Sequence, residues 1–248
     1  MPFMRLAQSS STDVTLGTPS ELNAGYAKGN LDMGAMSSFY FLQSGNLELV
    51  PGVSISCTGA VGSVLLFSKV APERLDGATI KISSSSATSV NLLRILLQEH
   101  YGATPQLVAD PQPDLNEEGA DAALVIGDRA LEVDAAWTGQ YHRVDLGQWW
   151  LQTVELPMVF GLWAARCDWV FNNKKQFDEI AALLLTAKEQ GLSNSFENVL
   201  NTAQFRTGLT TERLTKYFRE ELDFDLSEKH LQGLARYRDL AVKHGLLR

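Results

Sequence analysis

Six hydroxyl side chains occupy the seven consecutive positions from Ser83 to Ser89, in the stretch ISSSSATSVNLLRILLQEHYG. The apolar residues after them recur at steps of three and four, which predicts a helix that ends at Gly102. The preceding GATIKIS is short and partly β-branched, which indicates a strand. The hydroxyls therefore lie where a strand turns into a helix, and the unpaired amides of a first helical turn favour an anion there.

A simpler interpretation of the same stretch is one N-cap followed by a serine-rich turn. Serine is a common N-cap residue because its hydroxyl accepts a hydrogen bond from an amide of the first turn. A cap needs only one or two hydroxyls, however, and this segment has six. The excess favours a second role, in which some of these hydroxyls donate to a bound carboxylate.

The composition excludes several classes of partner. The 248-residue chain has a net charge of −8, which argues against a nucleic-acid groove and against binding to an anionic membrane. No apolar run reaches the roughly 20 residues of a membrane-spanning helix, and the first residues have no signal-peptide pattern. Cys57 and Cys167 are far apart in the sequence and are expected to be free thiols. These features indicate a soluble cytoplasmic protein.

Strands alternate with helices up to about residue 173, which predicts an α/β fold with a mainly parallel sheet. Two long apolar strands, at 62–69 and 157–166, bracket a middle α/β unit. We therefore expect two lobes, one formed by 1–70 with 167–248 and the other by 71–166, with a ligand cleft between them. The C-terminal part is expected to be helical, over residues 174–190, 194–205, 210–221 and 227–244.

Further polar side chains, two hydroxyls and one carboxylate, also lie next to predicted strands. Ser38 ends DMGAMSS, Ser63 ends the CTGAVGS loop, and Asp128 follows the strand in LVIGDRAL. Each has a simpler explanation beside a ligand-binding one: Ser38 can merely end a strand, and Asp128 can cap the helix after it. The glycines around Ser63 favour a ligand-binding role for that residue.

Five stretches together resemble, in order and spacing, the chorismate dehydratases of the futalosine route to menaquinone. They are SELNAGYAKGNLDMGAMSS, GAVGSVLLFSK, SSSSATSVNLLRILL, AALVIGDRAL and LPMVFGLWAAR. The resemblance implies a two-lobe fold like that of type II periplasmic binding proteins, with C-terminal helices. It also implies a hydro-lyase that removes water from chorismate to give 3-[(1-carboxyvinyl)oxy]benzoate, without a metal or an organic cofactor.

The resemblance further implies which residues bind the substrate. Chorismate carries two carboxylates, and Ser85, Ser86, Thr88 and Ser89 would hold one of them. Ser63 matches a ligand-binding serine of the family, and Ser38 and Asp128 are further candidates. The asparagine that is important for activity in the family belongs to a Tyr-Leu-Asn-x-x-Pro-like motif and would precede Met1, so no catalytic residue is assigned. At Ser83 many members carry an aspartate.

Two other functions are compatible with these features. One is a non-catalytic protein that binds a small anionic solute, since the fold does not determine the activity. The other is the related enzyme of the same pathway that releases dihydroxynaphthoate, although its histidine-bearing motif is not apparent in this sequence. Either protein would act as a monomer or a homodimer on a small molecule.

Overall fold

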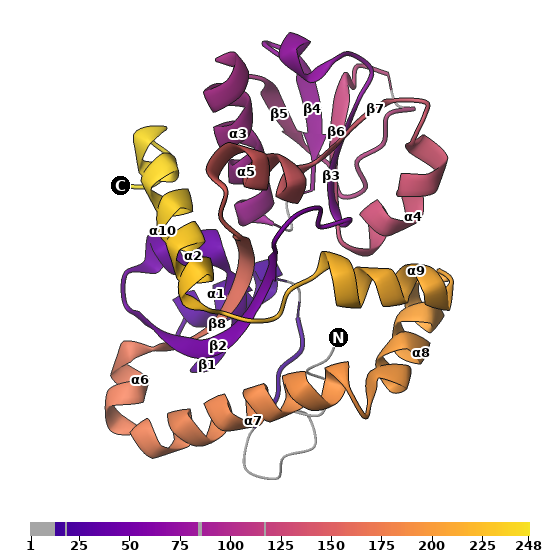
Figure 1. The fold of residues 1–248 in the computed structure, drawn as a ribbon. Helices are drawn as coiled ribbons and strands as arrows, with labels where there is room; N and C mark the ends of the chain where they lie inside the picture. The colour runs from indigo at the N-terminus through magenta and orange to yellow at the C-terminus, as the bar shows by residue number, and fades with distance from the viewer. Residues whose placement is uncertain (1–12, 18, 84–85, 117) are drawn as a thin grey trace. The chain divides into compact units, whose positions relative to one another are not determined.

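The computed structural model describes residues 13–17, 19–83, 86–116 and 118–248, which form two compact units. Unit 1 comprises residues up to Ser56 and Val159–Glu228, and unit 2 comprises Cys57–Met158 and Lys229–Arg248. Figure 1 shows the elements of both. None of the described helices is long and apolar enough to cross a membrane. Cys57 and Cys167 are free thiols, as expected.

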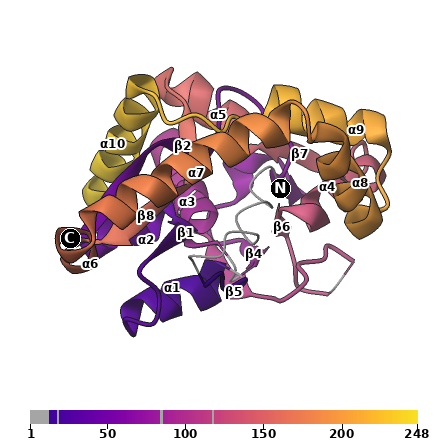
Figure 2. The same ribbon diagram turned by 90° about the horizontal axis from the view of Figure 1, so that it is seen from below.

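Unit 1 contains a three-stranded sheet in the order β1-β8-β2, in which β1 and β8 are antiparallel. Its elements are α1 (Pro19–Ala27), β1 (Met33–Ser37), α2 (Ser38–Ser44), β2 (Leu47–Cys57), β8 (Met158–Arg166), α6 (Cys167–Asn172), α7 (Lys174–Leu192), α8 (Phe196–Thr207), α9 (Thr211–Lys216) and a π-helical turn, η3 (Tyr217–Glu221). Apolar side chains of α7, α8 and α9 pack with those of β2 and β8 in one core. Figure 2 shows α7 lying along this sheet.

Unit 2 contains a five-stranded sheet in the order β5-β4-β6-β3-β7. Its elements are β3 (Val64–Ser68), the 3-10 turn η2 (Pro72–Arg74), β4 (Thr79–Ile82), α3 (Ala87–Tyr101), β5 (Gln106–Ala109), β6 (Ala122–Ile126), α4 (Asp128–Trp137), β7 (His142–Asp145), α5 (Leu146–Val154) and α10 (Glu228–Lys243). The helix α4 covers one face of this sheet through a core that includes Phe67 and Trp137. The helices α3 and α5 lie on the other face (Figure 1).

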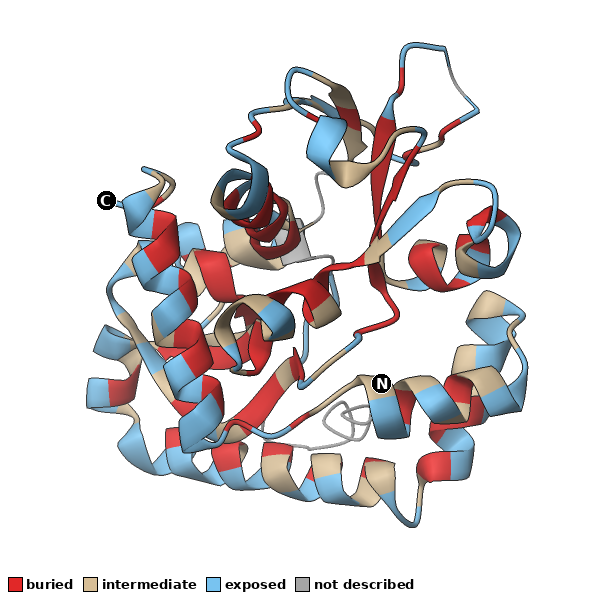
Figure 3. Cartoon of the chain, turned by 45° about the horizontal axis from the view of Figure 1, so that its top comes forward, coloured by how far each residue is buried: buried red, intermediate tan, exposed pale blue. Residues whose placement is uncertain are grey.

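The strand β3 is buried along its whole length, whereas the edge strands β5 and β7 are largely exposed. Figure 3 shows buried residues along strands and exposed residues on the outer sides of the helices. Burial on both faces explains why VLLFS is a continuous apolar run rather than an alternating one. The prediction of this strand from its apolar run is confirmed.

The prediction of a mainly parallel sheet is wrong in one respect. The strands β4, β5 and β6 are parallel, but β3 is antiparallel to both β6 and β7. The reason is the connection from β3 to β4, which has only a 3-10 turn and no crossover helix. Without a crossover the chain enters β4 from the end at which it left β3, so the two strands run in opposite directions.

The observed units also differ from the predicted lobe boundaries. Residues 57–70, expected in the first lobe, belong to unit 2 because β3 pairs with β6 and β7. Residues 229–248 belong to unit 2 as well, because α10 packs on the helices of that unit. Tyr237 of α10 is fully buried, and its hydroxyl donates to the carbonyl of Thr88 at 3.1 Å. A ligand cleft between the lobes stays a prediction.

The end of α10 is held to α3 by charge. Lys243 Nζ lies 2.7 Å from Glu99 Oε1, and His244 Nε2 is hydrogen-bonded to the same oxygen. The hydrogen bond from Lys243 is the largest cause that lowers the pKa of the Glu99 carboxyl. A carboxyl whose pKa is lowered by folding stabilises the fold above its unfolded pKa, and this contribution is lost as the pH falls through the folded pKa.

We therefore expect Glu99→Gln to lower the free energy of unfolding at neutral pH by about 0.2–1 kcal/mol, as is usual for a partly exposed ion pair. The difference between wild type and variant should shrink as the pH falls below about 4.3, the usual pKa of glutamate. Urea denaturation at a series of pH values measures it. A difference that stays constant down to pH 3 would contradict the assigned ion pair.

Candidate functional site

Three parallel strands of unit 2 end at the same edge of the sheet, which we call the carboxyl edge. Their last residues are Ile82 of β4, Ala109 of β5 and Ile126 of β6. The antiparallel β3 begins at this edge, since Val64 lies opposite Ile126 and the amide of Gly127 donates to the carbonyl of Ser63 at 2.7 Å. Ligands of open α/β sheets bind at this edge, so the polar groups there form the candidate site.

A pocket of about 320 Å³ opens at the carboxyl edge. Its lining comes from all three strand ends: Ser83 after β4, Pro111, Gln112 and Pro113 after β5, and Val125, Ile126, Arg129 and Glu132 of β6 and α4. A volume of this size is at the lower end of the range for small-molecule sites. The pocket therefore adjoins the serine-rich turn that the sequence singled out.

The serine-rich turn provides the cap of α3. Ser86 Oγ accepts from the amide of Ser89 at 3.3 Å and donates to Ser89 Oγ at 3.0 Å. The side chains of Thr88 and Ser89 are buried, whereas Ser83 and Ser86 are half-buried. The predicted residue Ser85 lies outside the described residues. The capping interpretation is thus confirmed for Ser86, and a contact of this turn with an anion stays a prediction.

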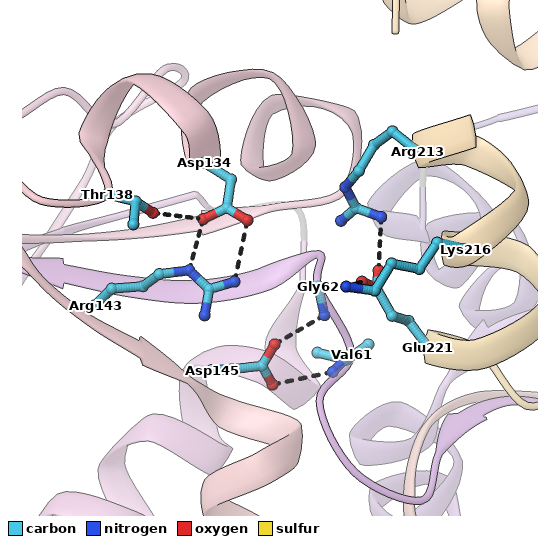
Figure 4. A network of polar contacts seen from close by, with 9 residues as sticks. All are labelled: Val61, Gly62, Asp134, Thr138, Arg143, Asp145, Arg213, Lys216 and Glu221. Carbon is cyan, nitrogen blue, oxygen red and sulfur yellow. Dashed lines mark hydrogen bonds and ion pairs between the residues drawn. The ribbon is translucent and has the colours of Figure 1, made fainter. Parts of the chain in front are cut away.

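Ser63 lies at the same edge, in the loop between β2 and β3. The residue is only 5% exposed, and the preceding Gly62 has a φ of +65°, a conformation that favours glycine. The loop is fastened by Asp145, whose carboxylate accepts from the amides of Val61 at 3.0 Å and Gly62 at 2.8 Å (Figure 4). The structure therefore brings Ser63 and the serine-rich turn together at one sheet edge.

Asp128 also lies at the carboxyl edge but does not cap α4 in the expected way. The N-cap position is occupied by Gly127, with a φ of +64°, and Asp128 is the first residue of the helix. Its side chain is exposed, and a carboxylate in the first turn interacts favourably with the helix dipole. The alternative that Asp128 caps the helix is therefore wrong, and a ligand-binding role for it stays a prediction.

Ser38 belongs to unit 1, where it begins α2 directly after β1. Ser37 is the N-cap residue, because its hydroxyl accepts from the amide of Tyr40 at 3.2 Å. Ser38 is fully buried, and its hydroxyl has no hydrogen-bond partner among the described residues. Burying an unpaired hydroxyl costs about 1–3 kcal/mol, and a ligand-binding role for Ser38 stays a prediction.

Sequence reasoning missed two polar side chains of this region. Asp145 has a local signal that identifies it, since an aspartate directly before the apolar LGQWWL is typical of an N-cap. Arg129 has no such signal. Its Nε is buried and has no hydrogen-bond partner within the described part of the chain, and its guanidinium lies 5.8 Å from the centre of the Trp137 ring and 3.8 Å from Asp114 Oδ2. Only the tertiary structure places Arg129 in the pocket lining.

The polar groups at the carboxyl edge suit the binding of a small anion. They include the hydroxyls of Ser63, Ser83 and Ser86 and the first turn of α3, and the charged residues Arg129 and Glu132 also line the pocket. Hydroxyl groups and the positive end of a helix stabilise a carboxylate without introducing a compensating charge. Such a site is able to hold an anionic substrate and to exclude water from it.

A family model described as menaquinone biosynthesis matches residues 1–243. A chorismate dehydratase from Thermus thermophilus is 34% identical over 169 residues, which cover 60% of this chain and 59% of that protein. The aligned region thus spans little more than half the length of that relative.

Solved structures resemble the fold at low sequence identity. A protein from Archaeoglobus fulgidus superimposes with a TM-score of 0.70 at 19% identity, covering 99% of this chain and 94% of that one. The periplasmic aliphatic sulphonate binding protein of Escherichia coli gives a TM-score of 0.66 at 14% identity, covering 99% of this chain and 84% of that one. The fold is therefore like that of the periplasmic binding proteins, as predicted.

Proposed function

Because the chain belongs to the menaquinone biosynthesis family, we propose that it is a chorismate dehydratase. The reaction removes water from chorismate and gives 3-[(1-carboxyvinyl)oxy]benzoate, a hydro-lyase step of the futalosine route. The observation that carries the proposal is the sequence identity of 34% to a chorismate dehydratase over 169 residues. The hydroxyl-rich carboxyl edge of unit 2 supports it, because the substrate has two carboxylates to be held.

The chemistry asks little of the protein beyond binding. Loss of the C4 hydroxyl and the C3 proton makes the ring aromatic, and this supplies the driving force. The protein has to orient the substrate and to shield it from water. In this proposal the hydroxyl of Ser63, together with the first turn of α3, holds one carboxylate. The enolpyruvyl carboxylate of the substrate itself takes the proton, as is thought for the family.

A second candidate function is the binding of a small anion without turnover. It is favoured by the similarity of the fold to a sulphonate-binding protein, a likeness that by itself shows no activity. The two functions differ in one observable. A binding protein leaves chorismate intact, whereas the enzyme converts it to a product lighter by one water.

The test is to incubate the purified chain with chorismate and to follow the products by mass spectrometry. We expect a product that has lost water, and we expect Ser63→Ala to lower kcat/KM by about ten- to a hundredfold. This is the effect of losing one hydrogen bond to a charged group, worth about 1.5–3 kcal/mol.

A matched control is Ser68→Ala, at the other end of β3. Ser68 is buried like Ser63, but its hydroxyl donates to the carbonyl of Val70. Its removal should cost some stability and leave kcat/KM within about twofold. Unaltered chorismate with the wild-type chain would contradict the dehydratase proposal, and equal losses in both serine variants would contradict the role of Ser63.

A further inference from the structure

Asp145 joins two segments that are far apart in the sequence. The residue is 6% exposed, and its carboxylate lies between the first turn of α5 and the loop that ends at Ser63. Oδ1 accepts from the amides of Gly147 at 3.0 Å and Gln148 at 3.1 Å, which is the ordinary geometry of an N-cap. The carboxylate also accepts from the amides of Val61 and Gly62, on the loop.

The bonds to the loop exceed what a cap requires. A serine, threonine or asparagine caps a helix about as well as an aspartate, because one acceptor oxygen is enough. Here Oδ2 accepts from the amide of Gly62 at 2.8 Å, the residue directly before Ser63 (Figure 4). The second oxygen therefore orients the peptide unit between Val61 and Gly62, one residue before Ser63, rather than the helix.

An independent observation shows how closely α5 and the loop fit. A Cβ atom on Gly147 would lie 2.5 Å from Cys57 Sγ and 2.6 Å from the carbonyl oxygen of Gly59. The first turn of α5 thus packs directly against the chain before and after Gly59, since Val61 Cβ also lies within 3.1 Å of that Cβ position. Only a residue without a side chain permits Asp145 to reach the loop amides from this helix.

We propose that Asp145 is a positioning residue for Ser63 in the dehydratase reaction, an inference that rests on the proposed function. Ser63 is held from two sides. Asp145 fixes the Val61–Gly62 peptide unit one residue before it, and the carbonyl of Ser63 accepts from the amide of Gly127. A hydroxyl that is fixed before the substrate binds loses less entropy on binding. The amides of Val61 and Gly62 are occupied by Asp145, so the loop contributes the Ser63 side chain rather than these amides.

The sharpest test is Asp145→Asn, which has nearly the same shape. The amide oxygen of asparagine retains the bonds to Gly147, Gln148 and Val61, while its NH₂ group faces the amide of Gly62, so two donors oppose each other. We expect kcat/KM for chorismate to fall about tenfold or more, mainly through KM. Hydrogen exchange at Gly62 and Ser63 should accelerate, while the amides of α5 stay protected.

The control for a general loss of stability is Thr210→Ala in unit 1. Thr210 caps α9 through a bond from the amide of Arg213 at 3.2 Å, and its loss should lower the thermal midpoint by a few degrees without changing kcat/KM. An activity loss as large as that of Asp145→Asn would show that stability alone explains both.

Two further outcomes separate the proposals from each other. Wild-type protein that leaves chorismate unchanged would overturn the proposed function, whatever the exchange data show. Unchanged hydrogen exchange at Gly62 and Ser63 in Asp145→Asn would overturn the positioning role, even if the wild-type protein is an active dehydratase.

Discussion

Replacing Gly233 with alanine is expected to lower the free energy of unfolding of unit 2 by about 2–3 kcal/mol, the usual cost of overpacking. Gly233 lies on the buried face of α10, and a Cβ atom there would clash with the carbonyl oxygen of Pro157. That oxygen cannot easily move, because the indole N–H of Trp150 donates to it at 3.3 Å. The helix α10 therefore has to shift away from the chain around Pro157.

Whether Gly233→Ala lowers or raises the free energy of unfolding shows whether the packing of α10 or the helix propensity of alanine dominates. Alanine is about 0.8–1.0 kcal/mol more favourable than glycine within a helix, so Gly233→Ala would stabilise an unpacked α10. Chemical denaturation of the variant measures the net change, with Gln232→Ala on the exposed side of the same helix as the control. A variant as stable as wild type would contradict the packing of α10 at Pro157.

The same substitution should also weaken chorismate binding. Tyr237 lies one helical turn after Gly233, and its hydroxyl donates to the carbonyl of Thr88 in the first turn of α3. Burial raises the pKa of Tyr237, which favours the protonated phenol that acts as the donor. A shift of α10 breaks this bond and loosens the helix entrance at the carboxyl edge.

Replacing Gly147 with alanine is the second change with a large expected effect. The new Cβ atom would be 2.5 Å from Cys57 Sγ, 2.6 Å from Gly59 O and 3.1 Å from Val61 Cβ. We expect a loss of about 2–3 kcal/mol in the free energy of unfolding, together with loss of the proposed dehydratase activity. The activity is lost because α5 and the loop that ends at Ser63 are forced apart.

Two variants show whether this explanation holds. Cys57→Ala removes the sulfur but not the carbonyl of Gly59, so the double variant with Gly147→Ala should recover only a small part of the stability. Gln152→Ala, on the exposed side of α5, should leave both stability and activity close to wild type. Full recovery in the double variant would mean that the sulfur alone causes the clash.

The sequence was sufficient for most of the individual elements. The apolar periodicity of α3, the stop at Gly102 and the uninterrupted apolar run of β3 each predicted the element that the structure contains. The helices after Asn173 were predicted within a few residues, and the serine-rich turn was correctly placed at a helix entrance. These features were predictable because they depend on residues three or four positions apart, or on one uninterrupted segment.

Other parts of the site had no such local signal. The strands β2 and β7 and the helix α5 were not among the predicted elements, although Asp145 before α5 has the pattern of an N-cap. The buried Nε of Arg129 and the unpaired hydroxyl of Ser38 depend on what surrounds them, and neither is visible in their neighbours along the chain.

The sequence by itself determined where the hydroxyls lie along the chain and which elements carry them. Only the tertiary structure decided that β3 is antiparallel to β6, that α10 belongs to unit 2, and that Asp145 binds the amides of Val61 and Gly62. These pairings join segments more than fifty residues apart. They depend on chain connectivity and on close fits such as that of Gly147 against Gly59, and a periodic pattern in the sequence reports neither.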